Sequence, residues 1–191
     1  MSSDPEKWNM RYREARAASA ARVLVENAHL LPPTGTALDL ACGLGENALV
    51  LAQRGLKTLA WDSSPVAIDK LRKRAQAQGT RVEATVRDVV ERPPEPDRFD
   101  VIVVAHFLDR SLVESIINAL RPAGLLFYQT FTRTRVGDQG PRNPSYLLAD
   151  GELLSMFSSL KLLVYREEGL VGNSTRGFRG EAMLVGRKTS G

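Results

Sequence analysis

From Thr36 onward, short apolar runs alternate with amphipathic stretches of helical length, and this alternation limits the fold more than any other feature of the chain. The apolar runs, which are strand candidates, occupy residues 36–41, 56–62, 81–89, 99–107, 125–131, 160–168 and 181–188. The helix candidates between them occupy residues 46–55, 65–79, 111–124 and 150–160. Such alternation predicts an α/β protein whose parallel sheet has helices on both faces. The last two strands have no helix between them and are expected to be antiparallel.

The amount and composition of the chain suit one globular domain. The sequence has 191 residues, 43% hydrophobic and 25% charged, with a net charge of +4, which is an ordinary balance. Its single cysteine, Cys42, permits no intrachain disulfide, as is usual in a reducing compartment. We find neither a run of roughly 18 apolar residues that would suggest a membrane span nor an apolar signal core near the start. We therefore expect a cytoplasmic protein with no membrane partner.

The first thirty residues are expected to form a helix that precedes the sheet. Apolar residues recur at helical spacing until Pro32-Pro33 ends the pattern. Trp8 and Tyr12 are four positions apart, so they share one face of that helix. They either pin the helix to the core or close it over a ligand. The chain accordingly divides into a helical cover, residues 1–33, and a sheet domain, residues 34–191.

A glycine-bearing turn joins the first strand of the sheet domain to its first helix. Residues 39–47 read DLACGLGEN, and their glycines permit a sharp turn and the close approach of a ligand. Asp62 ends the second strand, where a carboxylate can accept both hydroxyl hydrogens of a ribose. Asp88 ends the third strand, where it can accept an amino hydrogen from an adenine. Ligands of open α/β sheets bind at the carboxyl ends of the strands, so these groups are expected to meet in one crevice.

The same turn satisfies the G-x-G-x-x-A pattern of a dinucleotide site over residues 43–48. Two carboxylates argue against that interpretation, because a pyrophosphate at a helix N-terminus is disfavoured by nearby negative charge. Glu46 lies in the first turn of the helix and Asp39 lies just before the glycines. They suit a ligand with positive charge, such as an amino group and a sulfonium. The chain also lacks a Tyr followed four residues later by a Lys, so the catalytic pair of short-chain dehydrogenases is absent.

Five segments resemble, in order, the successive motifs of class I S-adenosylmethionine-dependent methyltransferases: LDLACGLGENALVLAQRG, AWDSSPVAIDKLR, VRDV, FDVIVVAHFL and LRPAGLLFYQTF. The resemblance runs from about Thr36 to Phe131. It implies a Rossmann-like, doubly wound sheet of seven strands in the order 3-2-1-4-5-7-6, with strand seven antiparallel, and S-adenosyl-L-methionine as cofactor. The segments KWNMRY and ALRPAGLLFYQTF, with GPRNPSYLL and GELL further on, are similar to the small tellurite-resistance-type (thiopurine-methyltransferase-like) group.

The resemblance also implies which residues bind the cofactor. Asp39, Gly43 and Gly45 would flank its methionine part, and Asp62 would hold its ribose. Asp88 and the backbone of Val89 would read the adenine. Family members usually place an apolar residue after the ribose carboxylate, whereas this chain has Ser63, so the adenine must pack elsewhere. Cys42 is expected to be a small packing residue of the loop rather than a nucleophile. The full expected set is Trp8, Tyr12, Asp39, Ala41, Cys42, Gly43, Gly45, Asn47, Asp62, Ser63, Asp88, Val89, Ala105 and His106.

His106, just past the fourth strand, is the candidate catalytic residue. The resemblance would place it near the methyl group, as an orienting donor or a general base; the alternative is an ordinary histidine at a strand end. The long polar loop at residues 132–148 is a candidate lid or substrate wall. Arg110 and Arg142 can pair with an anionic substrate, although a solvated surface is an equal alternative, and Tyr146 is the third candidate substrate-binding residue. We predict no metal site.

Together these features predict an enzyme that transfers a methyl group in line to a small-molecule acceptor, as a monomer or weak homodimer. A soft, anionic acceptor would need no general base, whereas a hydroxyl or an amine would need one. The alternatives are an RNA methyltransferase on the same fold and a non-catalytic S-adenosylmethionine-binding protein. The chain has no appended RNA-binding module and no interleaved aromatic and basic residues, which counts against a nucleic-acid partner. The intact glycine loop with Asp62 and Asp88 counts against a non-catalytic role.

Overall fold

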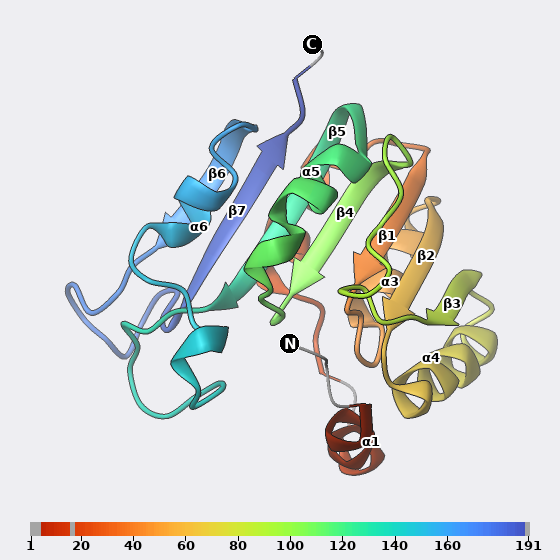
Figure 1. The fold of residues 1–191 in the computed structure, drawn as a ribbon, viewed down its shortest axis with the longest axis horizontal. Helices are drawn as coiled ribbons and strands as arrows, with labels where there is room; N and C mark the ends of the chain where they lie inside the picture. Colours follow the sequence, from red (N-terminus) through yellow and green to blue (C-terminus); the bar gives the residue numbers. More distant parts are fainter. Residues whose placement is uncertain (1–4, 16–17, 190–191) are drawn as a thin grey trace.

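A seven-stranded sheet in the order β3-β2-β1-β4-β5-β7-β6 forms the centre of the computed structural model, which describes residues 5–15 and 18–189 (Figure 1). The strands are β1 Thr36–Leu40, β2 Lys57–Asp62, β3 Val82–Val86, β4 Phe99–Ala105, β5 Leu120–Phe131, β6 Lys161–Glu167 and β7 Glu181–Arg187. Strands β1 to β5 pair in parallel, and β7 is antiparallel to both of its neighbours. The predicted strand order and the reversed seventh strand are confirmed.

Helices cover both faces of the sheet. On one face lie α5 (Val113–Ala119) and α6 (Glu152–Met156). On the other face lie α2 (Arg22–Glu26), α3 (Glu46–Gln53) and α4 (Pro65–Ala77). The central strand β4 shows why two layers form, because Val101 to Val104 are all fully buried and alternate between the two faces. Strands buried on both faces are the rule in parallel sheets.

The N-terminal part is not one helix, so the expectation for the first thirty residues is wrong. The helix α1 covers Pro5–Glu14, residues 18–21 belong to no helix or strand, and α2 is followed by the 3₁₀ helix η1, Ala28–Leu30. Backbone N–H groups of this region donate to side chains of the sheet domain instead of to the preceding turn. The donors and acceptors are Ala18 to Glu46 Oε1 (3.1 Å), Ala21 to Asn47 Oδ1 (2.8 Å) and Val23 to Gln129 Oε1 (2.8 Å).

The helix α1 lies beyond the carboxyl ends of the parallel strands, beside α4 (Figure 1). Lys70 of α4 fixes its C-terminal end, since Nζ donates to the carbonyl oxygens of Tyr12 (2.5 Å), Arg13 (2.9 Å) and Ala15 (3.3 Å). Cations at a helix C-terminus satisfy carbonyl groups that have no partner within the helix. These contacts hold α1 at the carboxyl ends of the strands, where Tyr12 lies next to the glycine turn.

Two elements end before their apolar patterns do. The helix expected over residues 111–124 is the 3₁₀ helix η2 (Arg110–Leu112) followed by α5, and it stops at Ala119. Lys188 Nζ donates there to the carbonyl oxygens of Leu120 (2.5 Å) and Asn118 (3.2 Å). The strand expected over residues 99–107 stops at Ala105 because the next residue leaves the extended conformation. Among the residues that the structure describes, no helix combines the length and apolar character needed to cross a membrane.

Candidate functional site

The carboxyl ends of four neighbouring strands meet at one level of the sheet. The register pairs Leu40 of β1 with Trp61 of β2 and with Val104 of β4. The residues that follow these three therefore lie side by side, and the last of them, Ala105, pairs with Gln129 of β5. We call this row across the sheet the carboxyl row. Its members are Asp62, Ala41, Ala105 and Gln129.

Two of the four non-glycine residues with positive φ in the described structure lie at this row or directly after it. Ala41 and His106 follow the ends of β1 and β4 and have φ angles of 54° and 55°, in the left-handed region. This conformation costs a residue with a Cβ about 1–3 kcal/mol unless its surroundings hold it. Flanking hydrogen bonds do so, since Cys42 N–H donates to the Trp61 carbonyl (2.9 Å) and His106 N–H to the Gln129 carbonyl (2.8 Å). Strain of this kind is typical of functional sites.

The two glycines of the turn are required for different reasons. A Cβ on Gly43 would lie 2.9 Å from the hydroxyl of Tyr12, so the cover helix presses on the turn at this point. A Cβ on Gly45 would lie 2.3 Å from a methyl carbon of Leu71, so Gly45 lets α3 pack against α4. Both residues also have positive φ angles, 53° and 80°. The structure thus gives Gly45 a packing role where the sequence suggested close approach to a ligand.

Asp39 is a buried acid with one unused oxygen. Its Oδ2 accepts a hydrogen bond from Ala48 N–H (2.9 Å), whereas its Oδ1 has no hydrogen-bond partner among residues 5–15 and 18–189. Burial raises the pKa of Asp39 from 3.8 to about 8, and the charges of Asp62 and Glu46 add to the effect. A buried polar atom without a partner is costly, so this oxygen is suited to a donor or cation from a ligand.

Asp62 shapes the glycine turn from the neighbouring strand. Its Oδ2 accepts from Gly43 N–H (2.8 Å) and its Oδ1 from Ser64 N–H (2.9 Å). The side chain is buried, and this burial raises the pKa of Asp62. Each carboxylate oxygen can accept a second hydrogen bond. Asp62 therefore retains the acceptor capacity that a pair of ligand hydroxyls would need.

Glu46 does not join these acids as a free carboxylate. Arg74 of α4 binds both of its oxygens, at 2.8 Å and 2.6 Å, and Ala18 N–H donates to one of them. The sequence interpretation counted Glu46 among the acids that face the ligand, and the structure corrects this. Asp88 caps the turn after β3, where its Oδ1 accepts from Val90 N–H (2.9 Å) and Glu91 N–H (3.3 Å).

The structure also gives the surroundings of several other predicted cofactor-binding residues. Trp8 and Tyr12 stack with their ring centroids 5.9 Å apart, as their four-residue spacing predicts. Cys42 is buried, and burial raises the pKa of its thiol, which suits a packing residue. The Oδ1 of Asn47 is occupied by Ala21 N–H. Ser63 is half-buried. Val89 is 5% exposed and belongs to the apolar core.

His106 sits in a polar network that the sequence did not reveal. Its Nε2 lies 3.0 Å from Oε1 of Glu181, and its ring stacks on Phe131 with centroids 4.9 Å apart. Glu181 Oε2 accepts from Nε2 of Gln129. Glu181 begins β7 and faces Phe131 only through the antiparallel register of β5 and β7. No local motif could identify it, because that register is not legible in the sequence.

The three predicted substrate-binding residues differ in their surroundings. Arg110 is paired with Glu152 (2.6 Å) and donates to the carbonyl oxygen of Ser145 (2.8 Å), so it fastens the loop at residues 132–148. The Glu152 carboxylate raises the pKa of Arg110, and Arg110 in turn lowers the pKa of Glu152. Arg142 and Tyr146 are exposed on that loop, the latter in the 3₁₀ helix η3, Pro144–Tyr146.

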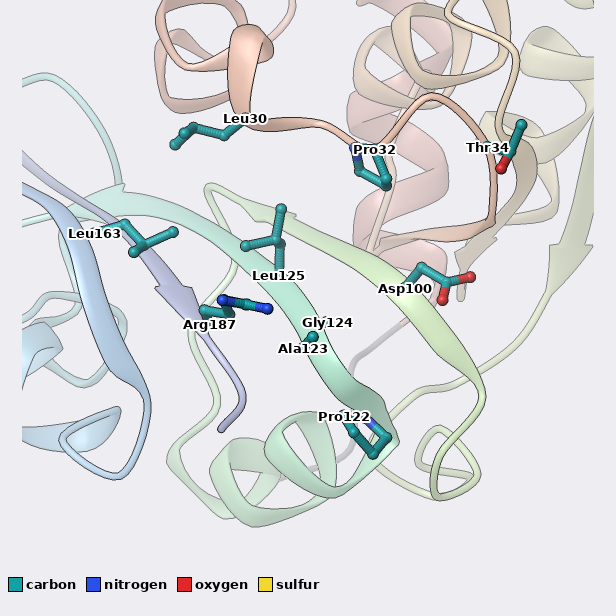
Figure 2. A pocket seen from close by; sticks show the side chains of 10 residues that line it. All are labelled: Leu30, Pro32, Thr34, Asp100, Pro122, Ala123, Gly124, Leu125, Leu163 and Arg187. Carbon is teal, nitrogen blue, oxygen red and sulfur yellow. The ribbon is translucent and has the colours of Figure 1, made fainter. Parts of the chain in front are cut away.

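A hollow of about 470 Å³ lies at the opposite end of the sheet, near the starts of β1 and β4 (Figure 2). Its residues are Leu30, Pro32, Thr34, Asp100, Pro122, Ala123, Gly124, Leu125, Leu163 and Arg187. Its carboxylate is already engaged, because Asp100 Oδ2 accepts from Thr36 N–H (2.7 Å) and from Arg121 (2.8 Å). Ligands of open α/β sheets bind at the carboxyl ends of the strands, so this hollow is not the candidate site.

Comparison with known proteins supports the sequence interpretation. Residues 37–124 match a family described as a methyltransferase domain. A ubiquinone biosynthesis O-methyltransferase of Actinobacillus pleuropneumoniae serotype 7 (strain AP76) is 29% identical over 107 residues, 51% of this chain and 46% of that protein. The chain thus spans about half the length of the curated relatives it matches.

Two solved structures share the fold over nearly the whole chain. TehB from Haemophilus influenzae has a TM-score of 0.73 and 21% identity, covering 96% of this chain and 67% of that one. The [4+2]-cyclase SpnF has a TM-score of 0.73 and 18% identity, covering 92% of this chain and 86% of that one. At these identities the likeness shows the fold, so closer kinship with the tellurite-resistance group stays a prediction.

The strand order, the reversed β7 and the glycine turn at the carboxyl row define the class I methyltransferase fold. Residues 37–124 are similar to a methyltransferase domain, and the fold is that of solved S-adenosylmethionine-dependent methyltransferases. The solved structures described as S-adenosylmethionine-dependent methyltransferases imply S-adenosyl-L-methionine as the cofactor of this fold.

Proposed function

We propose that the protein transfers a methyl group from S-adenosylmethionine to a small-molecule acceptor. The observation that carries the proposal is Asp39 Oδ1, a buried oxygen without a partner in the described part of the chain, one strand away from the buried carboxylate of Asp62. A ligand that brings both a cationic amino group and a pair of ribose hydroxyls complements these two acids. When bound, S-adenosylmethionine supplies a methyl group on an activated sulfonium.

The residues of the chain fit this cofactor in a definite division of labour. We assign Asp39 and the turn of Ala41 to Gly45 to its methionine part. Asp62 is assigned to the ribose, and Asp88 with Val89 to the adenine. The segment of residues 1–33 is proposed as a cover whose Trp8 and Tyr12 exclude water from the reacting groups. The stacking of these rings and the position of the Tyr12 hydroxyl, directly against Gly43, support this assignment.

The acceptor is proposed to be a small molecule that carries a hydroxyl group. Two observations support this: the relatives named as ubiquinone biosynthesis O-methyltransferases, and a histidine, His106, placed beside the carboxyl row. The exposed Arg142 and Tyr146 form the proposed substrate wall. Arg110 supports that wall by fastening the loop, and this replaces direct contact with substrate as its role. We further propose that the protein acts in the cytoplasm as a monomer or weak homodimer.

Calorimetric titration with S-adenosylhomocysteine tests the cofactor assignment. Asp62→Asn removes the negative charge and one acceptor, so binding should weaken at least roughly tenfold, the cost of one charged hydrogen bond. Asp69→Asn is the matched control, because Asp69 is exposed on α4 and paired only with Lys73 in the described structure. Undiminished binding by Asp62→Asn, with wild-type affinity in the control, would contradict the ribose assignment.

A further inference from the structure

A chain of hydrogen bonds runs from the start of α2 to the imidazole of His106. Val23 N–H donates to Gln129 Oε1 at 2.8 Å. Gln129 Nε2 donates to Glu181 Oε2, and Glu181 Oε1 lies 3.0 Å from His106 Nε2. These hydrogen bonds thus link α2, the C-terminal part of β5, the start of β7 and the residue that follows β4.

The backbone N–H of Val23 determines which group donates and which accepts in each of these hydrogen bonds. A backbone N–H can only donate, so the side-chain oxygen of Gln129 must face Val23 and its NH₂ group must face Glu181. An NH₂ group can only donate, and a carboxylate can only accept. The remaining oxygen of Glu181 therefore accepts from His106, which places the ring hydrogen on Nε2. In the neutral imidazole the basic nitrogen is then Nδ1.

The imidazole is held in place by more than this bond. Its ring stacks on Phe131, and its backbone is fixed in the left-handed region by the hydrogen bond from His106 N–H to the Gln129 carbonyl. The side chain is nevertheless 44% exposed, whereas that of Glu181 is 18% exposed. An oriented but accessible imidazole suits a group that takes a proton from a bound molecule.

We propose that Glu181 is a positioning residue that makes Nδ1 of His106 the general base for a hydroxyl-bearing acceptor; this rests on the proposed function. As the acceptor oxygen bonds to the methyl carbon, Nδ1 takes the hydroxyl proton. The bond between that carbon and sulfur breaks, and its electron pair stays on sulfur. The Glu181 carboxylate stabilises the imidazolium, which later gives its proton to water. A thiolate acceptor would make no use of this device.

The position of the ring hydrogen can be measured without any ligand. The chain has two histidines, so His29→Gln leaves His106 as the single imidazole for nitrogen-15 spectroscopy. We expect hydrogen on Nε2 in this background. In Glu181→Gln, the NH₂ group of Gln129 claims the new amide oxygen, so the new NH₂ group faces His106. Nε2 must then accept, and the hydrogen should move to Nδ1.

Two outcomes of the spectroscopy separate the alternatives. A move of the hydrogen to Nδ1 in Glu181→Gln supports the positioning role, and hydrogen that stays on Nε2 overturns it. Glu114→Gln is the matched control, since Glu114 is exposed on α5 and should leave the spectrum unchanged. Equal affinity of the His29→Gln protein and of its Glu181→Gln and Glu114→Gln variants for S-adenosylhomocysteine would show that the fold is intact.

Methyl transfer to phenol and to thiophenol tests the general base itself. Thiophenol is already ionised in mildly alkaline buffer, so it needs no base. We expect Glu181→Gln to lower kcat for phenol about a hundredfold, the lower range of general-base effects, and to leave transfer to thiophenol unchanged. An equal loss on both acceptors would overturn the base role. If wild type methylates neither probe while the hydrogen still moves, the proposed function fails and the positioning role stands.

Discussion

At the scale of single residues, the buried carboxyl group of Asp39 makes the stability of the fold depend on pH. Burial raises the pKa of Asp39 from 3.8 to about 8. Between these values the native protein keeps the proton that the unfolded chain releases. The unfolded state then binds fewer protons than the native state, so the free energy of unfolding falls as the pH rises through this window. Asp39, which we propose contacts the cofactor, therefore lowers the stability of the fold as the pH rises through this window.

The variant Asp39→Asn should therefore flatten the pH dependence of stability. Its side chain does not titrate, so the decrease in unfolding free energy between about pH 4 and pH 8 should be smaller than in wild type. The difference in slope is at most about 1.4 kcal/mol per pH unit for one proton. Urea denaturation at a series of pH values measures both slopes. Identical slopes for the two proteins would contradict the raised pKa of Asp39.

The glycines of the chain allow packing and backbone strain to be separated. Gly45→Ala and Gly79→Ala both place a Cβ at a positive φ, 80° and 63°, which costs about 1–2 kcal/mol. Only at Gly45 would the new atom also lie 2.3 Å from Leu71, because nothing lies within 4 Å at Gly79. We expect Gly45→Ala to lower the free energy of unfolding clearly more. Equal losses in urea denaturation would argue against the tight α3–α4 contact.

Local sequence motifs predicted the part of the candidate site that neighbouring strands and the glycine turn supply. Asp39 and Gly43 lie within one short segment, and Asp62 ends the next strand, so spacing alone predicted their neighbourhood. Glu181 and Gln129 could not be predicted, since they meet His106 only through pairing of distant strands. Glu46 was misjudged for a related reason: its partner Arg74 lies 28 residues away on α4.

At the scale of elements, the segment before α2 is held by side chains rather than by helical hydrogen bonds. The helical pattern of the sequence was overridden here because Glu46, Asn47 and Gln129 offer acceptors to backbone N–H groups of residues 18–23. Such tertiary acceptors are not legible in a local pattern. The strands of the sheet were predictable because their long apolar runs are buried on both faces.

Removing one of these acceptors should release the segment without unfolding the sheet. In Asn47→Ala the buried N–H of Ala21 loses its acceptor, which should cost about 1–3 kcal/mol. Hydrogen exchange at Ala21 and Val23 should accelerate, while exchange in β4 should change little in comparison. Asn118→Ala is the control, because Asn118 is exposed at the end of α5. Unchanged exchange at Ala21 would contradict the anchoring role of Asn47.

At the scale of the whole molecule, the net charge of the chain is positive, whereas the buried titratable groups of the candidate site are acids. The chain carries 26 Lys and Arg against 22 Asp and Glu, a net charge of +4. The buried acids Asp39 and Asp62 nevertheless lie at the carboxyl row. Arg74 and Arg110 are committed to ion pairs with Glu46 and Glu152. Two buried acids at the carboxyl row suit a cationic cofactor rather than a phosphate backbone.

This distribution predicts weak binding to nucleic acid. In a filter-binding assay with a structured transfer RNA across a salt series, we expect low affinity and a shallow dependence of log affinity on log salt, since each phosphate contact adds about 0.9 to the slope for a duplex. Arg74 and Arg110 are already paired with carboxylates, which leaves fewer cations for phosphate contacts. The same titration with saturating S-adenosylhomocysteine controls for cofactor-dependent binding. Tight binding at physiological salt with a steep slope would overturn the small-molecule acceptor and favour an RNA methyltransferase.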